Sequence, residues 1–252
     1  MRIDTDRKEW EFMLSLENIV WSVPDGERII DGISYTVGEG KLVVVTGPNG
    51  GGKTTIAKLI AGLTKPDAGR ILFNGEDITD LDITARARKG IAYAFQQPVR
   101  FKGITVKDLL ELAYGSEMTV EERCELLGRV GLCAKEYLSR ELNSGLSGGE
   151  MKRIEIASVL ARRAPLSIFD EPEAGIDLWS FSRLVETFRK LRAEEKGTLL
   201  IISHQERILE IADEIVVIAD GRIRAHGEGK EILPSLLRNE IASLCPRGKE
   251  NA

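Results

Sequence analysis

The sequence lacks any apolar run long enough to cross a membrane. Its longest runs, such as Leu42 to Val45 and Leu199 to Ile202, are far shorter than the ~20 residues that a membrane-spanning helix needs. The residues from Met1 to Trp10 are rich in charge and lack the apolar centre of a secretory signal peptide. We therefore expect a soluble chain that works in the cytoplasm.

Cysteine is scarce, and positive charge is not in excess. Cys124, Cys133 and Cys245 are widely spaced and form no CxxC pair, whereas thiolate metal sites usually bring paired ligands. We therefore expect two partly buried thiols and one thiol in the C-terminal tail rather than a metal or cluster site. The formal net charge of -5 provides no broad attraction to nucleic acid, so no nucleic-acid partner is expected.

The chain does have short β-rich runs that alternate with helical periods. Its 252 residues are enough for one large α/β domain. The alternation predicts a mostly parallel sheet flanked by helices. A helix is expected at Lys53–Ala61. Strands are expected at Leu14–Val23, Ile33–Val37, Leu42–Thr46, Arg70–Phe73, Ile91–Phe95, Leu166–Phe169 and Leu199–Ile202, followed by a hairpin of Ile215–Ile218 and Arg222–Ala225.

The centre of the chain has a different pattern. From Thr105 to Leu138 the apolar residues recur at helical spacing and no strand-like run is present. This pattern predicts a helical sub-domain at about residues 97–150, inserted into a single domain of residues 1–252.

A glycine-rich segment follows the expected strand Leu42–Thr46. It reads Gly47-Pro48-Asn49-Gly50-Gly51-Gly52-Lys53-Thr54-Thr55 and fits the pattern GxxxxGK followed by Ser or Thr. Glycines allow the backbone to fold tightly, so that its N–H groups converge on phosphate oxygens at a helix N-terminus. In such loops the lysine reaches the β- and γ-phosphates and the following hydroxyl binds Mg²⁺. The segment therefore predicts a nucleotide site.

Two more motifs follow in a defined order. Leu146-Ser147-Gly148-Gly149-Glu150 opens a helical run, which predicts a second anion site at a helix N-terminus. The expected strand Leu166–Phe169 then ends in Asp170 and Glu171. Together with the phosphate loop, this order resembles the ATP-binding cassette (ABC) superfamily of ATPases. The resemblance covers roughly Leu14 to Leu237. It implies an α/β fold of the P-loop NTPase class, with a mostly parallel core sheet, an N-terminal antiparallel β portion and an inserted helical sub-domain.

The resemblance assigns a role to each motif. It implies ATP and Mg²⁺ as cofactors, with Asp170 supporting the metal, usually through a water, and Glu171 orienting the attacking water. Gln96 is the expected glutamine beside both, and Gln97 is the alternative if the alignment shifts by one residue. The resemblance implies catalytic roles for Glu171, His204, Gln96 and Asp177, nucleotide contacts from Gly47, Pro48, Asn49, Gly50, Gly51, Gly52, Lys53, Thr54, Thr55, Ser147, Gly148, Gly149 and Glu150, and metal ligation by Thr54, Gln96 and Asp170.

The superfamily also implies a partner. Each active site of an ABC ATPase combines the phosphate loop of one subunit with the signature of another, so a head-to-tail homodimer is expected when ATP binds. Four local segments resemble SufC, the ABC ATPase of iron–sulfur cluster assembly, and favour a SufB/SufD-like scaffold as partner. They are Phe95–Val99 followed by Gly103, Asn143–Arg153, Glu171–Asp177, and Arg207–Leu209 after His204.

Two other functions remain open. The alternative to cluster assembly is the nucleotide-binding subunit of an ABC membrane transporter, whose partner is a membrane permease. A role in DNA repair or at the ribosome is less favoured, because the sequence has no heptad runs and no second phosphate loop. A further hypothesis concerns Lys152, which either pairs with Glu171 in the resting subunit or lies solvated on an exposed helix face.

Overall fold

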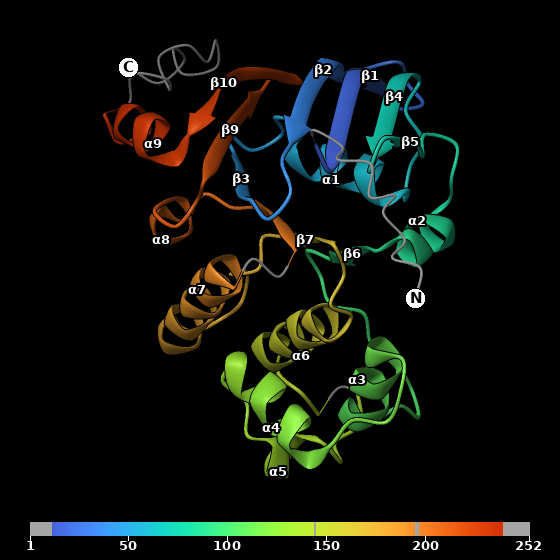
Figure 1. Ribbon diagram of the computed structural model, residues 1–252, viewed down its shortest axis with the longest axis vertical. Helices are drawn as coiled ribbons and strands as arrows, with labels where there is room; N and C mark the ends of the chain where they lie inside the picture. Colours follow the sequence, from blue (N-terminus) through green and yellow to red (C-terminus); the bar gives the residue numbers. More distant parts are fainter. Residues whose placement is uncertain (1–11, 144, 195–196, 239–252) are drawn as a thin grey trace, which may run out of the picture.

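A computed structural model describes residues 12–143, 145–194 and 197–238 of the chain. It has two sheets in its upper part and a lobe of helices below them (Figure 1). The expected P-loop NTPase fold, with an antiparallel N-terminal sheet, a mostly parallel core sheet and a helical insertion, is confirmed.

The core sheet has six strands, and its central strands are buried on both faces. Neighbouring strands from β3 to β6 and from β3 to β9 run parallel, while β10 is antiparallel to β9. Val43 and Val45 belong to one apolar cluster, whereas Leu42 and Val44 belong to the other. Because successive side chains point to opposite faces, this strand supports both layers of the domain. The strand order is β10 (Arg222–Glu228), β9 (Glu214–Ala219), β3 (Leu42–Thr46), β8 (Thr198–Ile202), β7 (Leu166–Asp170) and β6 (Ile91–Ala94).

The second sheet is antiparallel and covers α1 (Lys53–Ala61). Leu14, Ile33 and Ile71 of this sheet belong to the same apolar cluster as Ile56 and Leu59 of α1. The helix is thus packed between the two sheets, which fixes the position of its N-terminus. The strand order is β2 (Arg28–Val37), β1 (Leu14–Ser22), β4 (Ala68–Phe73) and β5 (Glu76–Asp77).

The helices on the other side of the core sheet form one apolar cluster with it. Phe169 of β7 and Phe188 of α7 lie edge to face, with ring centroids 5.0 Å apart. The lower lobe is built from the inserted helices, which pack on α6 (Figure 1). The remaining helices are α2 (Ile83–Lys89), α3 (Val106–Tyr114), α4 (Val120–Arg129), α5 (Ala134–Tyr137), α6 (Gly148–Ala161), α7 (Leu178–Ala193), α8 (Glu206–Leu209) and α9 (Gly229–Leu237).

Two expectations on the elements need correction. The pair Cys124 and Cys133 is exposed rather than partly buried, because both residues lie on the solvent side of the helical lobe; Cys245 lies outside the described residues. Strand β2 begins at Arg28, earlier than expected, because pairing with β1 extends it past the irregular Asp31-Gly32 step.

Candidate nucleotide site

The phosphate loop joins β3 to α1 and lies close to the neighbouring strand β9. A β-carbon at Gly47 would lie 2.1 Å from the carbonyl oxygen of Ile218, so only glycine fits there. Gly52 has φ 103° and caps α1 without any side-chain hydrogen bond to the first turn. The first N–H groups of α1 therefore point into the loop without a side-chain acceptor, as an anion site requires.

Lys53 lies inside this loop and is 7% exposed. Its Nζ donates to the carbonyl oxygens of Gly47 and Pro48, both at 2.9 Å. Burial lowers the pKa of this lysine, while the negative charges of Glu171 and Asp170 act in the opposite direction. The Lys53 ammonium group therefore lies close enough to the Glu171 and Asp170 carboxylates to interact with their charges.

Asp170 is fully buried at the C-terminal end of β7. One carboxylate oxygen accepts a hydrogen bond from Thr54 Oγ1 at 3.1 Å, and the other accepts from the Tyr93 hydroxyl at 2.9 Å. Burial is the main cause that raises the pKa of Asp170. Tyr93 was not identified from the sequence; its position on β6, next to β7, is the only signal that could have found it.

Glu171 follows directly and has a different environment. Its Oε2 accepts a hydrogen bond from Gln96 Nε2 at 2.7 Å, so Gln96, and not the alternative Gln97, lies beside it. Its backbone N–H donates to the Ile202 carbonyl at 3.0 Å. The φ angle of Glu171 is 46°, in the left-handed region, which costs roughly 1–3 kcal/mol for a residue other than glycine. The local strain is thus located at the residue expected to act on water.

A third carboxylate lies two residues further along. Glu173 Oε1 accepts a hydrogen bond from the Ser203 hydroxyl at 2.6 Å, and Ser203 Oγ accepts one from the Gln205 N–H at 3.0 Å. His204 lies between these two residues and is exposed. Burial raises the pKa of Glu173. Sequence reasoning used Glu173 only as part of a family resemblance and gave it no role at the site.

The signature motif begins α6. Ser147 caps this helix by accepting from the Glu150 N–H at 3.2 Å, and Glu150 accepts from the Ser147 N–H at 2.7 Å. The Tyr137 hydroxyl also donates to Glu150, and these bonds lower the pKa of Glu150 to about 2. The Glu150 carboxylate is therefore turned towards its own helix start, while the Ser147–Gly149 backbone forms the exposed part of the motif.

Asp177 lies next to the signature. It caps α7 by accepting from the N–H groups of Trp179 and Ser180 at 3.1 and 3.0 Å. A β-carbon at Gly149 would lie 2.6 Å from the Gly175 carbonyl oxygen, so the signature packs directly against the loop that leads to Asp177.

The site residues expected from the sequence thus form two groups in the structure. Lys53, Thr54, Gln96, Asp170 and Glu171 meet on the core, and the signature and Asp177 meet at the starts of α6 and α7.

Neither reading of Lys152 made from the sequence is correct. Its side chain is 1% exposed, so it is not solvated. Its Nζ donates to the backbone carbonyls of Phe95, Gln96 and Asp170 and lies 3.5 Å from Glu155 Oε2. Glu171 is held by Gln96 instead. Lys152 therefore links α6 to the ends of β6 and β7.

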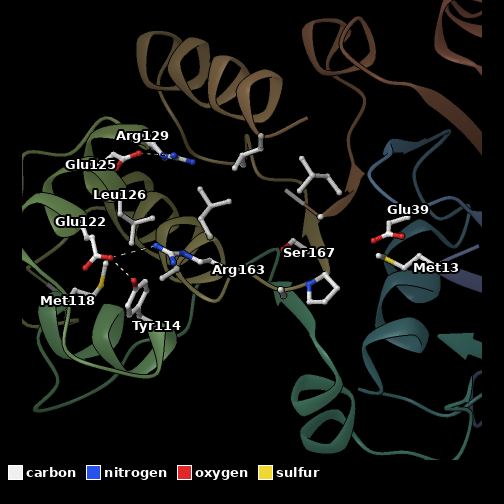
Figure 2. A pocket seen from close by; sticks show the side chains of 17 residues that line it. Met13, Glu39, Tyr114, Met118, Glu122, Glu125, Leu126, Arg129, Arg163 and Ser167 are labelled. Atoms are coloured by element: carbon white, nitrogen blue, oxygen red, sulfur yellow. Dashed lines mark hydrogen bonds and ion pairs between the residues drawn. The ribbon is translucent and has the colours of Figure 1, made fainter. Parts of the chain in front are cut away.

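A cavity of about 610 Å³ lies elsewhere, between the helical lobe and the core. Figure 2 shows Glu122 and Arg129 of the lobe on one side and Met13 and Glu39 of the core on the other. Ser167 of its wall is near the start of β7, whereas the Asp170 carboxylate is at the end of that strand. This cavity is therefore separate from the phosphate loop.

Residues 30–174 match the model of the family described as ABC transporter, which is more than half of the chain. The chain belongs to the ABC transporter family. It is an ATPase with the ATP-binding cassette fold. In the described residues no helix has the length and apolar character needed to span a membrane.

Proteins of similar sequence support the same family. An uncharacterized ABC transporter ATP-binding protein of Methanocaldococcus jannaschii is 42% identical over 81% of this chain and 85% of its own length. The lipopolysaccharide export system ATP-binding protein LptB of Escherichia coli K12 is 34% identical over 82% of this chain and 88% of its own. These names favour the membrane transporter, the alternative, over the SufC-like role, which they do not support.

A solved structure has the same fold. The dimeric, post-hydrolysis state of an ATP-binding cassette bound to ADP and Pi is 26% identical, with a TM-score of 0.77. The match covers 86% of this chain and 98% of that one. That cassette was solved as a dimer with a hydrolysed nucleotide.

Proposed function

We propose that this ATPase is the ATP-binding subunit of a membrane transporter and works as a head-to-tail homodimer. Two observations support the proposal. Its relatives are named as transporter ATP-binding proteins. The observation that carries it is an apolar groove next to Gln96, because a partner bound there would contact the segment that holds Glu171.

The nucleotide would bind at the phosphate loop. The N–H groups of the loop and the Lys53 ammonium would hold the ATP phosphates, since both lie at the start of α1. The Thr54 hydroxyl and the Asp170 carboxylate are hard oxygen donors 3.1 Å apart, which is the donor type that Mg²⁺ prefers. The Gln96 side-chain oxygen would complete the set. Bound Mg²⁺ would neutralise phosphate charge and offset the burial of Asp170.

Glu171 would orient the attacking water. Its carboxylate lies beside Gln96 and shares an electrostatic site with Lys53, so it can accept a hydrogen bond from a water that faces the γ-phosphate. His204 would contact the γ-phosphate from the end of β8. The signature and Asp177 would complete the site of a second copy, because they lie away from the phosphate loop of their own chain.

The groove that we propose as the docking site lies between the end of β6 and α6. It encloses about 140 Å³. Val99 and Phe101 are 47% and 39% exposed at this place, although both are large apolar residues. Large apolar side chains exposed beside a groove are a surface that a protein partner can cover. The groove is lined by Tyr93, Phe95, Val99, Phe101, Leu109, Leu142, Met151, Ile154, Glu155 and Ser158.

The groove is mechanically connected to the catalytic carboxylates. The Phe95 N–H donates to Glu155 at 2.9 Å, and the Phe95 carbonyl accepts from Lys152. The next residue, Gln96, donates to Glu171. A partner that displaces Phe95 would therefore move both α6, which begins with the signature, and the side chain that holds Glu171. This is the link that a transporter requires between its permease and ATP hydrolysis.

The test is purification of the tagged chain from detergent-treated membranes and cytosol of its own cells, without air. Three forms are compared: the wild type, Phe101→Asp in the groove, and Leu112→Asp, a control that is 75% exposed on α3. We expect an integral membrane protein to be recovered with the wild type and with Leu112→Asp, and to be lost with Phe101→Asp. The recovered proteins are identified by mass spectrometry.

The same experiment can overturn the proposal. Recovery of a soluble SufB-like scaffold in place of a multi-span membrane protein would assign the chain to cluster assembly. Equal recovery with Phe101→Asp would show that the groove is not the docking site.

A further inference from the structure

Glu173 is a half-buried acid, and one of its carboxylate oxygens is shielded from solvent and has no partner among the described residues. It lies in the loop between β7 and α7, and its Oε1 accepts from the Ser203 hydroxyl at 2.6 Å. Its Oε2 is shielded from solvent and has no hydrogen-bond partner among the residues that the structure describes. A buried polar atom without a partner destabilises the folded chain. The second oxygen is therefore an acceptor in need of a donor.

The Ser203 bond controls the backbone on both sides of His204. Ser203 is fully buried, and its N–H donates to the Val45 carbonyl at 3.2 Å. Because the Ser203 hydroxyl gives its proton to Glu173, its lone pair is free to accept the Gln205 N–H at 3.0 Å. Glu173 thus fixes the turn that carries His204.

Charged groups surround Glu173 from three elements. Glu171 lies on the same loop and raises its pKa, and His204, after β8, lowers it. Lys152 of α6 also interacts with Glu173 electrostatically. Of these, the imidazole is the exposed side chain next to the backbone that Glu173 holds, and it can turn without disturbing the core. Lys152 is already bound to three carbonyls.

We propose that Glu173 is a positioning residue for His204: its Oε1 holds the Ser203–Gln205 backbone, and its Oε2 accepts an N–H of the His204 imidazole when ATP is bound. The proposal rests on the role proposed for His204 at the γ-phosphate. A carboxylate bound to one ring nitrogen fixes which nitrogen carries the proton and how the ring is oriented. The other ring nitrogen is then presented to the phosphate in one defined state.

The first measurement is steady-state ATP hydrolysis by the full chain. Glu173→Gln keeps an oxygen for Ser203 but replaces the second oxygen by an amide donor, which cannot accept from His204. We expect kcat to fall about tenfold, with the KM for ATP changed less than about twofold, because the phosphate loop is untouched. Glu117→Gln, an exposed carboxylate in the loop before α4, is the control and should keep wild-type turnover.

A double-mutant cycle separates positioning of His204 from support of the fold. If Glu173 acts through His204, the double variant Glu173→Gln with His204→Ala should be no slower than His204→Ala alone. Additive losses would overturn the proposal. Full activity of Glu173→Gln would overturn it as well, since it would mean that the Ser203 bond alone is sufficient.

The second measurement does not depend on turnover. The chain has two histidines, so ¹⁵N-histidine labelling gives two imidazole signal sets, and a His226→Asn variant assigns them. With a non-hydrolysable ATP analogue and Mg²⁺ bound, Glu173→Gln should change the ring ¹⁵N shifts of His204 and leave those of His226 unchanged. Unchanged His204 shifts would overturn the contact.

The two proposals can fail separately. Wild-type turnover in His204→Ala would refute the role of His204 in hydrolysis, and the ¹⁵N shifts measured with Glu173→Gln would not change that conclusion. Loss of turnover in His204→Ala with normal ¹⁵N shifts and normal turnover in Glu173→Gln would refute the role of Glu173 alone.

Discussion

Three acidic residues lie within four positions at the C-terminal end of β7, and their surroundings differ. Asp170 is buried and held by Thr54 and Tyr93, Glu171 is strained and held by Gln96, and Glu173 is held by Ser203. Because each carboxylate has its own partner, the three can take separate tasks in one site.

The clearest prediction at the residue scale concerns Glu171. Glu171→Gln keeps the size of the side chain but removes the negative charge that polarises water, so kcat should fall about 10²–10⁴-fold while ATP is still bound. Phosphate release and retention of radiolabelled ATP on gel filtration measure the two effects. Wild-type turnover in this variant would show that another group activates the water.

A second prediction concerns stability and pH. The pKa of Glu173 is raised from 4.5 by burial, so between 4.5 and the raised value the native carboxyl keeps a proton that the unfolded chain has lost. The free energy of unfolding therefore falls as pH rises through this window. Since glutamine does not titrate, the wild type should lose stability relative to Glu173→Gln as the pH rises from 4.5 through the raised pKa of Glu173.

Urea unfolding at each pH measures this difference, and Glu117→Gln serves as the exposed control. A stability difference between wild type and Glu173→Gln that stays constant across the range would contradict the raised pKa.

At the scale of elements, α1 depends on a residue from its neighbour α2. Arg86 is 1% exposed. Its guanidinium donates to the carbonyl oxygens of Leu59 and Ile60, at 2.6 and 2.9 Å, and thereby satisfies the C-terminal end of the helix that begins at Lys53. It also donates to Leu81 and Thr79 carbonyls at 2.9 Å. This one side chain joins the phosphate-loop helix to the segment before β6.

Replacing this arginine should therefore weaken the fold. Arg86→Met removes the guanidinium donor from four carbonyl oxygens, of which that of Leu59 keeps the Gly62 N–H. We expect the free energy of unfolding to fall by about 2–4 kcal/mol. Arg88→Met, an exposed position on the same helix, is the matched control. Urea denaturation of both variants gives the comparison, and equal stabilities would show that water replaces the guanidinium at no cost.

Helices and strands with local sequence signals were predicted correctly, whereas those that depend on distant contacts were not. The bounds of α1 and β3 agree with those expected, because a continuous apolar run and a glycine at each helix end are local signals. Helix α2 was not expected. Its one fully buried side chain is Arg86, so its sequence carries no apolar stripe, and its position depends on carbonyl groups that the fold brings to it.

At the scale of the whole molecule, the phosphate loop and the signature of one chain lie on different parts of it (Figure 1). A head-to-tail dimer would join each loop to the signature of the other copy. Lys53→Ala and Ser147→Arg should therefore each abolish turnover as homodimers, since each damages both sites.

Mixed dimers of these two variants should recover activity. A mixed dimer contains one doubly defective site and one intact site, and half of randomly formed dimers are mixed, so the mixture should regain about one quarter of wild-type turnover. Co-refolding or subunit exchange followed by ATPase assay measures it. If subunit exchange is confirmed and turnover is still not recovered, the active sites are not shared, or a dimer needs both sites intact for any turnover. A mixture of Lys53→Ala with wild type distinguishes these cases, because its mixed dimers have one intact site.

The sequence by itself determined the elements and motifs whose signals are local: the buried strands, the phosphate loop, the signature cap and the acidic pair at the end of β7. The roles given to these residues stay predictions. Tertiary structure alone decided what long-range contacts control: Tyr93 beside Asp170, Lys152 buried against three carbonyls, Arg86 at the end of α1, and Glu173 bound to Ser203. From the sequence alone, a polar side chain is predicted to be exposed to solvent. Only the fold shows which donors and acceptors it contacts when it is buried.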